Sequence, residues 1–224
     1  MGKKRPVEAR RQVAIVVAHP DDETLWAGGT ILGQKDWDCF VASLCRGDDP
    51  DRAPKFARVL QCLGARGRMA TLDDGPGQKP LPDAEAGDTI LRLLPDREFD
   101  LVLTHGPRGE YTRHLRHEET SKAVIALWES GRMRTRALWL FAYEDGGGKY
   151  LPRAHAAAHR KVVLPDEAWQ EKHRIITEVY GFATDTLEAR TTPREEAFWC
   201  FTSPLEVRRW IDSGGAGDED SRDV

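Results

Sequence analysis

The sequence predicts an α/β fold built around a doubly wound parallel sheet. Short apolar runs of strand length alternate along the chain with segments of helical periodicity. The connections between successive strands are long enough to cross over the sheet, as parallel strands require. The run at 13–17 contains no polar residue, which is typical of a central strand that is buried on both faces.

The first half of the chain follows this alternation closely. The second helix begins at Pro50 or Asp51 and ends near Leu63, because Gly64 readily takes the left-handed conformation that closes a helix. A loop rich in glycine and proline then follows the third strand at 73–82. We expect strand, helix, strand, helix and strand at 13–17, 24–32, 38–45, 50–63 and 68–72.

The alternation continues to residue 142 and then loosens. Pro95 ends the next helix, and a long polar loop at 105–116 follows the next strand. The expected helix, strand, helix and strand lie at 84–94, 99–104, 118–130 and 136–142. Beyond Tyr143 we expect an edge strand, a helix capped by Asp166 and a weaker helix, at 161–164, 166–180 and 194–201.

Length and composition indicate one folded domain. The chain has 224 residues, of which 40% are hydrophobic and 31% are charged, as in an ordinary soluble protein. No repeat or clear linker divides it, so we expect a single domain at 12–212. A flexible basic segment at 1–11 precedes this domain, and an acidic, glycine-rich, disordered tail at 213–224 follows it.

Charge and cysteine content limit the classes of partner and compartment. A net charge of -4 gives no electrostatic support for nucleic-acid binding, and no apolar stretch approaches the roughly 20 residues of a membrane span. The four cysteines form no CxxC pair and are expected to be reduced, mostly buried thiols. With no convincing targeting segment, we expect a cytoplasmic protein that acts on a small molecule and is compatible with a homo-oligomer.

Two polar clusters fall where predicted strands end. Residues 19–23, HPDDE, follow the strand at 13–17, and residues 105–117, which contain three histidines, follow the strand at 99–104. In an open α/β sheet, ligands bind outside the carboxyl ends of the strands. We therefore expect both clusters at one rim of the sheet.

The spacing within these clusters fits a metal site with one open position. His19 and Asp22 are three residues apart, and so are His114 and His117, which lets each pair converge on one point. His19, Asp22 and one of the two downstream histidines would leave a fourth position for water, as in catalytic zinc sites. Asp21 diverges from Asp22 and would face that water to take its proton.

The first cluster also has a purely structural interpretation. Asp22 and Glu23 would stabilise the first turn of a helix through the helix dipole, and His19 with Pro20 would simply form a turn.

The remaining histidines carry weaker signals. His105 either lines the site or merely ends its strand. His155 and His159 are four residues apart and would suit a helical metal pair, but their alanine-rich surroundings favour surface histidines.

The two clusters resemble a known family. Residues 18–23, AHPDDE, are similar to the signature of the PIG-L/LmbE-like zinc-dependent N-acetylglucosaminyl deacetylases, and residues 109–117, GEYTRHLRH, resemble that family's second motif, a tyrosine before HxxH. The resemblance covers the strand and helix order over about residues 12–180. It implies a Rossmann-like three-layer α/β sandwich with a mostly parallel central sheet, and a hydrolase that removes an N-acetyl or related acyl group from a GlcNAc-type amino-sugar conjugate.

The resemblance also implies a role for each matching residue. Asp21 would be the general base that activates water. His114, protonated, would stabilise the oxyanion or pass a proton to the leaving amine, and Tyr111 would add a second donor to the oxyanion. The implied ligands of Zn²⁺, or of another divalent metal such as Fe²⁺, are His19, Asp22 and His117.

The second motif departs from the family pattern. The family has an acidic residue between the two histidines that orients the first of them, whereas a leucine and Arg116 stand here. Arg116 has the wrong charge to raise the pKa of His114, so Glu110 or Glu118 is the expected substitute. The spacing between Tyr111 and His114 is also one residue longer than the common form.

Substrate contacts are expected from loops at the same rim. Arg46 and Asp48 follow the second strand, where the family has a loop that touches the sugar, although a plain turn explains these residues equally well. Arg108 and Arg113 flank the second motif and would meet an anionic group of the substrate. The glycine-rich stretch at 143–150 is interpreted as a mobile lid.

Three other functions compete with this hypothesis. In the first, the same site hydrolyses another small amide. In the second, the altered second motif makes the protein a catalytically impaired member of the family that binds sugar. A dinucleotide site is disfavoured, because the turn after the strand at 13–17 reads HPDD instead of GxGxxG and its carboxylates would repel a pyrophosphate.

Overall fold

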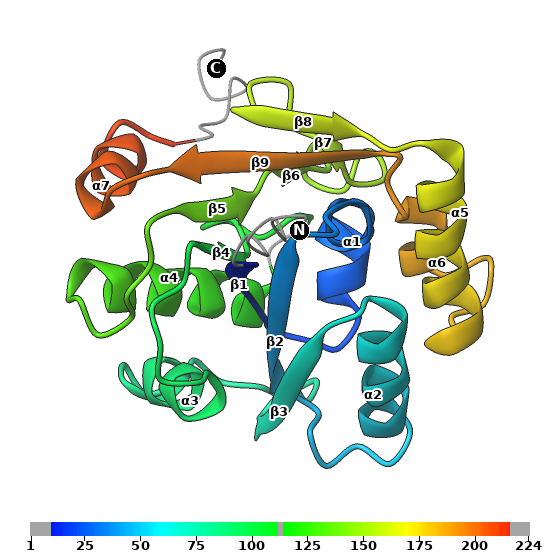
Figure 1. Cartoon of the computed structure of the whole chain (residues 1–224), viewed down its shortest axis with the longest axis horizontal. Helices are drawn as coiled ribbons and strands as arrows, with labels where there is room; N and C mark the ends of the chain where they lie inside the picture. Colours follow the sequence, from blue (N-terminus) through cyan, green and yellow to red (C-terminus); the bar gives the residue numbers. More distant parts are fainter. Residues whose placement is uncertain (1–9, 112–113, 216–224) are drawn as a thin grey trace, which may run out of the picture.

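A seven-stranded sheet forms the middle layer of the computed structural model, which describes residues 10–111 and 114–215 (Figure 1). The strand order is β3-β2-β1-β4-β5-β9-β8; the first five strands are parallel, and β9 runs antiparallel to both of its neighbours. The sheet is therefore mostly parallel, as predicted. Its strands are β1 Arg11–Val17, β2 Trp37–Cys45, β3 Arg66–Leu72, β4 Leu101–Thr104, β5 Leu138–Phe141, β8 Arg160–Val163 and β9 Glu195–Phe201.

Helices cover both faces of the sheet and complete three layers (Figure 1). One apolar core contains side chains of α3, α4 and α7 on one face, and a second core contains side chains of α1, α2, α6 and the π-helix η1 on the other. The helices are α1 Asp22–Gly33, α2 Arg52–Cys62, α3 Glu85–Leu93, α4 Leu115–Glu129, α5 Asp166–Arg174, η1 Ile175–Val179, α6 Leu187–Thr191 and α7 Pro204–Asp212.

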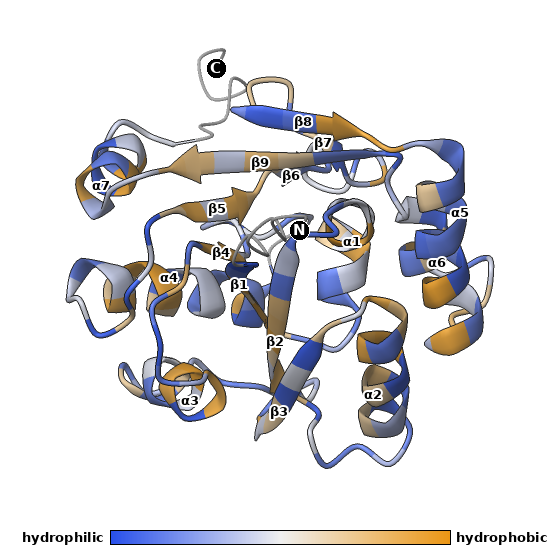
Figure 2. Cartoon of the chain, in the orientation of Figure 1, coloured by the Kyte–Doolittle hydropathy of each residue, from blue (hydrophilic) through white to orange (hydrophobic). Residues whose placement is uncertain are grey.

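The predicted burial of the central strands is observed. Residues 13–17 of β1 are all fully buried, because β1 lies between β2 and β4 and is covered on both faces. At the margin, β8 is largely hydrophilic where it begins, whereas the neighbouring β9 is mostly hydrophobic (Figure 2). This difference is expected for an edge strand beside an inner one.

The predicted weak helix at 194–201 is wrong, because this segment is strand β9. Its side chains alternate between the two cores: Ala197, Trp199 and Phe201 pack on one face, and Phe198 packs on the other. That period of two belongs to a strand that is buried on both faces. Glu195 and Glu196 at the start of this strand resemble the acidic first turn of a helix. They obscured the alternation of apolar residues that follows.

The other differences lie in the same part of the chain. The helix expected at 166–180 divides into α5 and the π-helix η1. Helices α6 and α7 were not predicted, nor was the hairpin of β6 Tyr143–Glu144 and β7 Arg153–Ala154.

The remaining expectations concern the cysteines, membrane-spanning helices and the two ends of the chain. Cys39 and Cys45 are buried free thiols, and Cys62 and Cys200 are partly buried free thiols. None of the described helices combines the length and apolar character that crossing a membrane would demand. Most of the expected flexible segment at 1–11 and of the expected tail at 213–224 lies outside the described residues, as does Arg113.

Candidate metal centre

The candidate site lies where the strand order of the sheet reverses. The chain runs from β1 outward to β2 and β3, and then returns to β4 on the other side of β1. Such a switch point leaves a crevice at the carboxyl ends of the two central strands, where open α/β sheets bind ligands. His19 follows β1 and His105 follows β4, so the fold brings both to this crevice.

Helix α4 carries the second motif to the same place. It begins at Leu115 instead of residue 118, with His114 directly before it. His117 therefore lies in its first turn, fully buried, with its ring 3.9 Å from that of His105 and 5.1 Å from that of His19.

Three ligand atoms converge at the centre of this cluster. Nδ1 of His19 lies 3.2 Å from Oδ2 of Asp22 and 3.1 Å from Nε2 of His117, and the latter two atoms are 3.4 Å apart. Tetrahedral zinc with bonds of about 2.0–2.2 Å places its ligand atoms roughly 3.3 Å apart. The observed triangle therefore has the size of one face of such a site.

The outer hydrogen bonds of the two histidines leave a lone pair on each inner nitrogen. Nε2 of His19 donates to Oδ1 of Asp74 at 3.0 Å, and Nδ1 of His117 donates to Oε2 of Glu110 at 2.6 Å. A neutral imidazole carries one N–H, so with both rings neutral Nδ1 of His19 and Nε2 of His117 would face each other as acceptors. Two lone pairs and a carboxylate oxygen at this separation repel one another, and the donor set therefore fits a divalent metal.

The pKa shifts in the cluster arise from the close contacts between its histidines and carboxylates. Burial works to lower the pKa of His19, but its hydrogen bonds to Asp22 and Asp74 outweigh burial and raise the pKa to about 9. Burial likewise opposes the charge of Asp22, but the rings of His117 and His105 hold the pKa of that carboxyl well below its usual range. The buried carboxylates require a positive charge in their midst, which a proton or a metal ion supplies.

His114 lies beside the ligand triangle. Its ring stacks on that of His117 with centroids 4.5 Å apart, and its Nδ1 atom is buried without a hydrogen-bond partner among the described residues. Burial and the neighbouring imidazoles of His117 and His19 lower the pKa of His114 to about 4. This shift favours the neutral ring, which offers a single N–H, over the protonated form that the resemblance implies.

Asp21 occupies a strained turn between the strand and the helix. Its φ of 136° lies outside the range that residues with a side chain usually adopt, and such strain is typical of functional sites. The carboxylate of Glu23 accepts the backbone N–H of Asp21 and the hydroxyls of Thr24 and Tyr180, which holds the turn. Burial, and then the negative charge of Asp22, raise the pKa of Asp21 well above its usual range.

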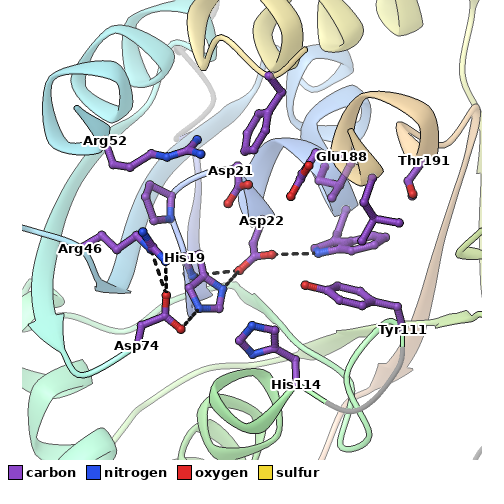
Figure 3. A pocket seen from close by; sticks show the side chains of 15 residues that line it. His19, Asp21, Asp22, Arg46, Arg52, Asp74, Tyr111, His114, Glu188 and Thr191 are labelled. Atoms are coloured by element: carbon purple, nitrogen blue, oxygen red, sulfur yellow. Dashed lines mark hydrogen bonds and ion pairs between the residues drawn. The ribbon is translucent and has the colours of Figure 1, made fainter. Parts of the chain in front are cut away.

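The ligand triangle borders a small pocket of about 180 Å³ (Figure 3). Figure 3 shows Arg46 and Asp74 on one side of His19, with Tyr111 and His114 on the other. Trp26 adds an apolar wall next to Tyr111, and its indole N–H donates to Oδ1 of Asp22 at 3.1 Å. The pocket thus has one side formed by arginine and aspartate and an aromatic side that also carries Glu188, with the ligand atoms between them.

The predicted substrate contacts fall in different places. Arg46 lines the pocket and donates from Nε and Nη2 to Oδ2 of Asp74 at 2.9 and 2.7 Å. Asp48 is exposed in a turn and does not line this pocket. Arg108 lines a second cavity of about 1060 Å³, which is also lined by Tyr111 and by part of the stretch expected to be a lid.

Three charged residues of the pocket were not predicted, namely Arg52, Asp74 and Glu188. Asp74 lies just beyond β3, so the rule that ligands bind at the carboxyl ends of strands would have found it. Arg52 begins α2, and its guanidinium lies 4.3 Å from the ring centroid of Phe182. Its Nη1 atom is buried and has no hydrogen-bond partner among the described residues, which leaves it available to a ligand.

Arg116 turns away from the histidines. It is buried and donates to backbone carbonyls of the loop after β3, with its Nε 2.6 Å from the carbonyl oxygen of Asp73. Glu110 contacts His117 and not His114, so it does not orient the first histidine as expected. The described part of the structure thus supplies no carboxylate partner to the buried Nδ1 of His114.

His105 lies in the site and does not merely end its strand. This residue is fully buried in the site, where its Nε2 accepts the backbone N–H of Ala18 at 2.9 Å. His155 and His159 lie elsewhere, with their rings 5.0 and 5.2 Å from that of Trp199.

Comparison with known proteins places this geometry in context. The family model described as PIG-L: GlcNAc-PI de-N-acetylase matches residues 14–128. No curated protein is significantly similar to the chain in sequence.

Several solved structures share the fold. N,N'-diacetylchitobiose deacetylase from Pyrococcus horikoshii has a TM-score of 0.64 at 17% identity, over 90% of this chain and 87% of that chain. The zinc-inhibited form of teicoplanin deacetylase Orf2 has a TM-score of 0.58 at 13% identity, over 80% and 90%. The 4-carboxy-2-hydroxymuconate hydratase of Pseudomonas putida KT2440 has a TM-score of 0.56 at 15% identity, over 96% and 92%.

Proposed function

Because the chain belongs to the PIG-L (GlcNAc-PI de-N-acetylase) family, we propose that it is a metal-dependent hydrolase that removes an N-acetyl group from an amino-sugar conjugate. The observation that carries this proposal is the triangle of His19, Asp22 and His117, whose facing acceptor atoms fit a divalent cation. Zinc is the expected ion, because two imidazoles and one carboxylate with an open position are typical of catalytic zinc sites.

A divalent cation held by this triangle supplies Lewis-acid chemistry, lowering the pKa of water and polarising a carbonyl oxygen. Asp21, which lines the same pocket, takes the proton from the attacking water. Because burial raises the pKa of Asp21, the carboxyl holds this proton and then delivers it to the amine as the amide C–N bond breaks. One residue thus serves as base and then as acid.

His114 and Tyr111 bind the oxyanion that forms on the acyl carbon. His114 is neutral and donates one N–H, since its pKa is lowered to about 4. Burial raises the pKa of Tyr111, so its hydroxyl stays protonated and donates as well. Both side chains line the pocket on the side opposite Arg46 and Asp74 (Figure 3).

The charged side of the pocket binds the sugar. Arg52 has an unpartnered buried nitrogen, and Asp74 and Arg46 present oxygen and nitrogen atoms beside it. Planar guanidinium donors paired with a carboxylate acceptor suit the hydroxyl groups of a sugar ring. The acyl group then lies on the aromatic side, next to Trp26 and Tyr111.

The deciding experiment measures acetate and free amine released by zinc-loaded protein. The substrates are N-acetylglucosamine conjugates, with simple N-acetyl amides as non-sugar controls and Asp21→Asn protein as the background. We expect equimolar acetate and amine from the sugar conjugates alone. Release from the non-sugar amides instead would indicate a general amidase, and sugar binding without release by the zinc-loaded protein would indicate a non-catalytic relative.

A further inference from the structure

A buried carboxylate lies behind the metal-ligand triangle and contacts two histidines at once. Glu110 is 1% exposed, and its Oε2 atom lies 2.6 Å from Nδ1 of His117 and 2.8 Å from Nδ1 of His105. Its other oxygen, Oε1, accepts the backbone N–H of Gly106 at 2.9 Å. Both oxygens of this carboxylate are therefore engaged as acceptors.

The position of each proton in this network follows from one backbone contact. The N–H of Ala18 donates to Nε2 of His105, so that nitrogen carries a lone pair and Nδ1 of His105 carries the proton. His105 therefore donates to Glu110, and His117 donates to the same oxygen. The chain of hydrogen bonds runs from the residue before His19 to the ring of His117, and so joins the two sequence motifs.

The same contact excludes His105 as a metal ligand. Its Nε2 lies 3.4 Å from Oδ2 of Asp22, within the range that a shared cation would require. The lone pair of that nitrogen, however, is already directed at the N–H of Ala18. His105 thus touches the site without an atom free to bind the metal.

We propose that Glu110 and His105 are positioning residues that lock His117 in the tautomer whose Nε2 lone pair faces the metal. This inference rests on the metal site of the proposed function. Metal-bound histidines commonly donate their outer N–H to a carboxylate, and loss of such a partner typically weakens metal affinity about 10–100-fold. The motif around the two histidines lacks an acidic residue between them, and Glu110 supplies a carboxylate to the second histidine from outside that interval.

The network requires a carboxylate and not merely a polar group. An amide has one acceptor oxygen and one NH₂ donor. In Glu110→Gln, one orientation directs the NH₂ at the N–H of Gly106, and the other directs it at both histidine N–H groups. Either orientation leaves donors facing one another in a buried site, which costs free energy.

The test measures the dissociation constant of Zn²⁺, and of Co²⁺ as a spectroscopic substitute, by competition with a chromophoric chelator. Glu110→Gln is compared with wild type and with Glu129→Gln, a matched change in a surface ion pair to Arg208. We expect Glu110→Gln to weaken metal binding about 10–100-fold and to alter the visible spectrum of bound Co²⁺. Glu129→Gln should match wild type.

Two changes at His105 separate its two contacts. His105→Gln keeps an acceptor for Ala18 but loses the donor to Glu110, so it should weaken metal binding. His105→Asn keeps a donor near the Nδ1 position and should bind metal more tightly than His105→Gln. In the double variant with Glu110→Gln, His105→Gln should add little further loss, because it acts through Glu110.

Three other outcomes would contradict this inference, each for a different reason. Wild-type affinity in folded Glu110→Gln would refute the positioning role and leave the proposed function intact. No metal binding by wild type would remove the metal site itself, and this inference with it. Loss of secondary structure in both Glu110→Gln and His105→Gln, measured by circular dichroism, would show that the network serves folding alone.

Discussion

Asp21 and Asp22 are adjacent in the sequence but have opposite electrostatic environments. Burial raises the pKa of Asp21, whereas the imidazoles of His117 and His105 overcome burial and lower the pKa of Asp22. Two carboxyls with pKa values pushed apart are typical of a site in which one carries a fixed charge and the other transfers a proton. Asp21 takes its positive φ in the turn between β1 and α1, directly before Asp22.

Replacing Asp21 tests this division of roles. Asp21→Asn should retain one metal ion per chain, because Asp21 is not part of the ligand triangle. Turnover should fall about 10²–10⁴-fold, the usual contribution of a general base. Elemental mass spectrometry and initial rates of acetate release check both statements. Unchanged turnover would exclude Asp21 as the base.

Arg52 should act on substrate binding and not on the chemical step. Arg52→Gln removes a charged donor to the substrate, worth about 1.5–3 kcal/mol, so KM should rise roughly 10–100-fold while kcat changes little. Arg58→Gln, an exposed change on the same helix, is the control. An equal fall in kcat without a change in KM would instead place Arg52 in the transition state alone.

At the scale of elements, helix α1 is held in place by a residue from the other end of the chain. Glu196 on β9 accepts the backbone N–H groups of Gly29 and Thr30 at 2.8 and 2.6 Å, and pairs with Lys172 at 2.7 Å. Both side chains of the ion pair are fully buried. Since Asp22 lies in the first turn of α1, the C-terminal part of the domain fixes the position of a ligand from the first motif.

Breaking this pair should destabilise the domain strongly. Lys172→Met leaves the buried charge of Glu196 without its partner, and the free energy of unfolding should fall by about 3–5 kcal/mol. Arg208→Met breaks the exposed pair with Glu129 and should cost at most about 1 kcal/mol. Denaturant unfolding followed by circular dichroism measures both. Equal effects of the two changes would contradict a central role for the buried pair.

At the scale of the whole molecule, the candidate metal site joins segments that are far apart in sequence. His19 follows β1, Asp74 follows β3 and His117 lies in the first turn of α4. The ring of His19 contacts both His117 and Asp74. A cation bound among them adds free energy only to the folded state, because the ligand set does not exist in the unfolded chain.

Zinc should therefore raise the thermal stability of the domain. At free zinc 100-fold above the dissociation constant, the gain is about 2.7 kcal/mol, or roughly 5–10 °C in Tm for a domain of this size. Differential scanning calorimetry with zinc and with a chelator measures it. Asp22→Asn should show little shift, and an equal shift in that variant would place the stabilising ion elsewhere.

Patterns in the sequence alone identified most of the sheet and the two motifs. The apolar run before His19 and the polar loops at strand ends were sufficient, because burial on both faces and ligand binding at carboxyl ends both leave local signatures. The seven-stranded, mostly parallel sheet confirms the predicted fold class. The roles of Asp21, His114 and Tyr111 stay predictions, and the family resemblance, not spacing, favoured His117 over His114 as a ligand.

Only the tertiary structure decided how the side chains of the site are supported. Glu110 or Glu118 was expected to serve His114, but the fold places Glu110 against His117 and His105. Arg116, between the two histidines in sequence, points away from them. The reason is physical: a sequence pattern shows which residues share an element, whereas the direction of a hydrogen bond and the tautomer of a histidine depend on atoms that distant segments bring within about 3 Å.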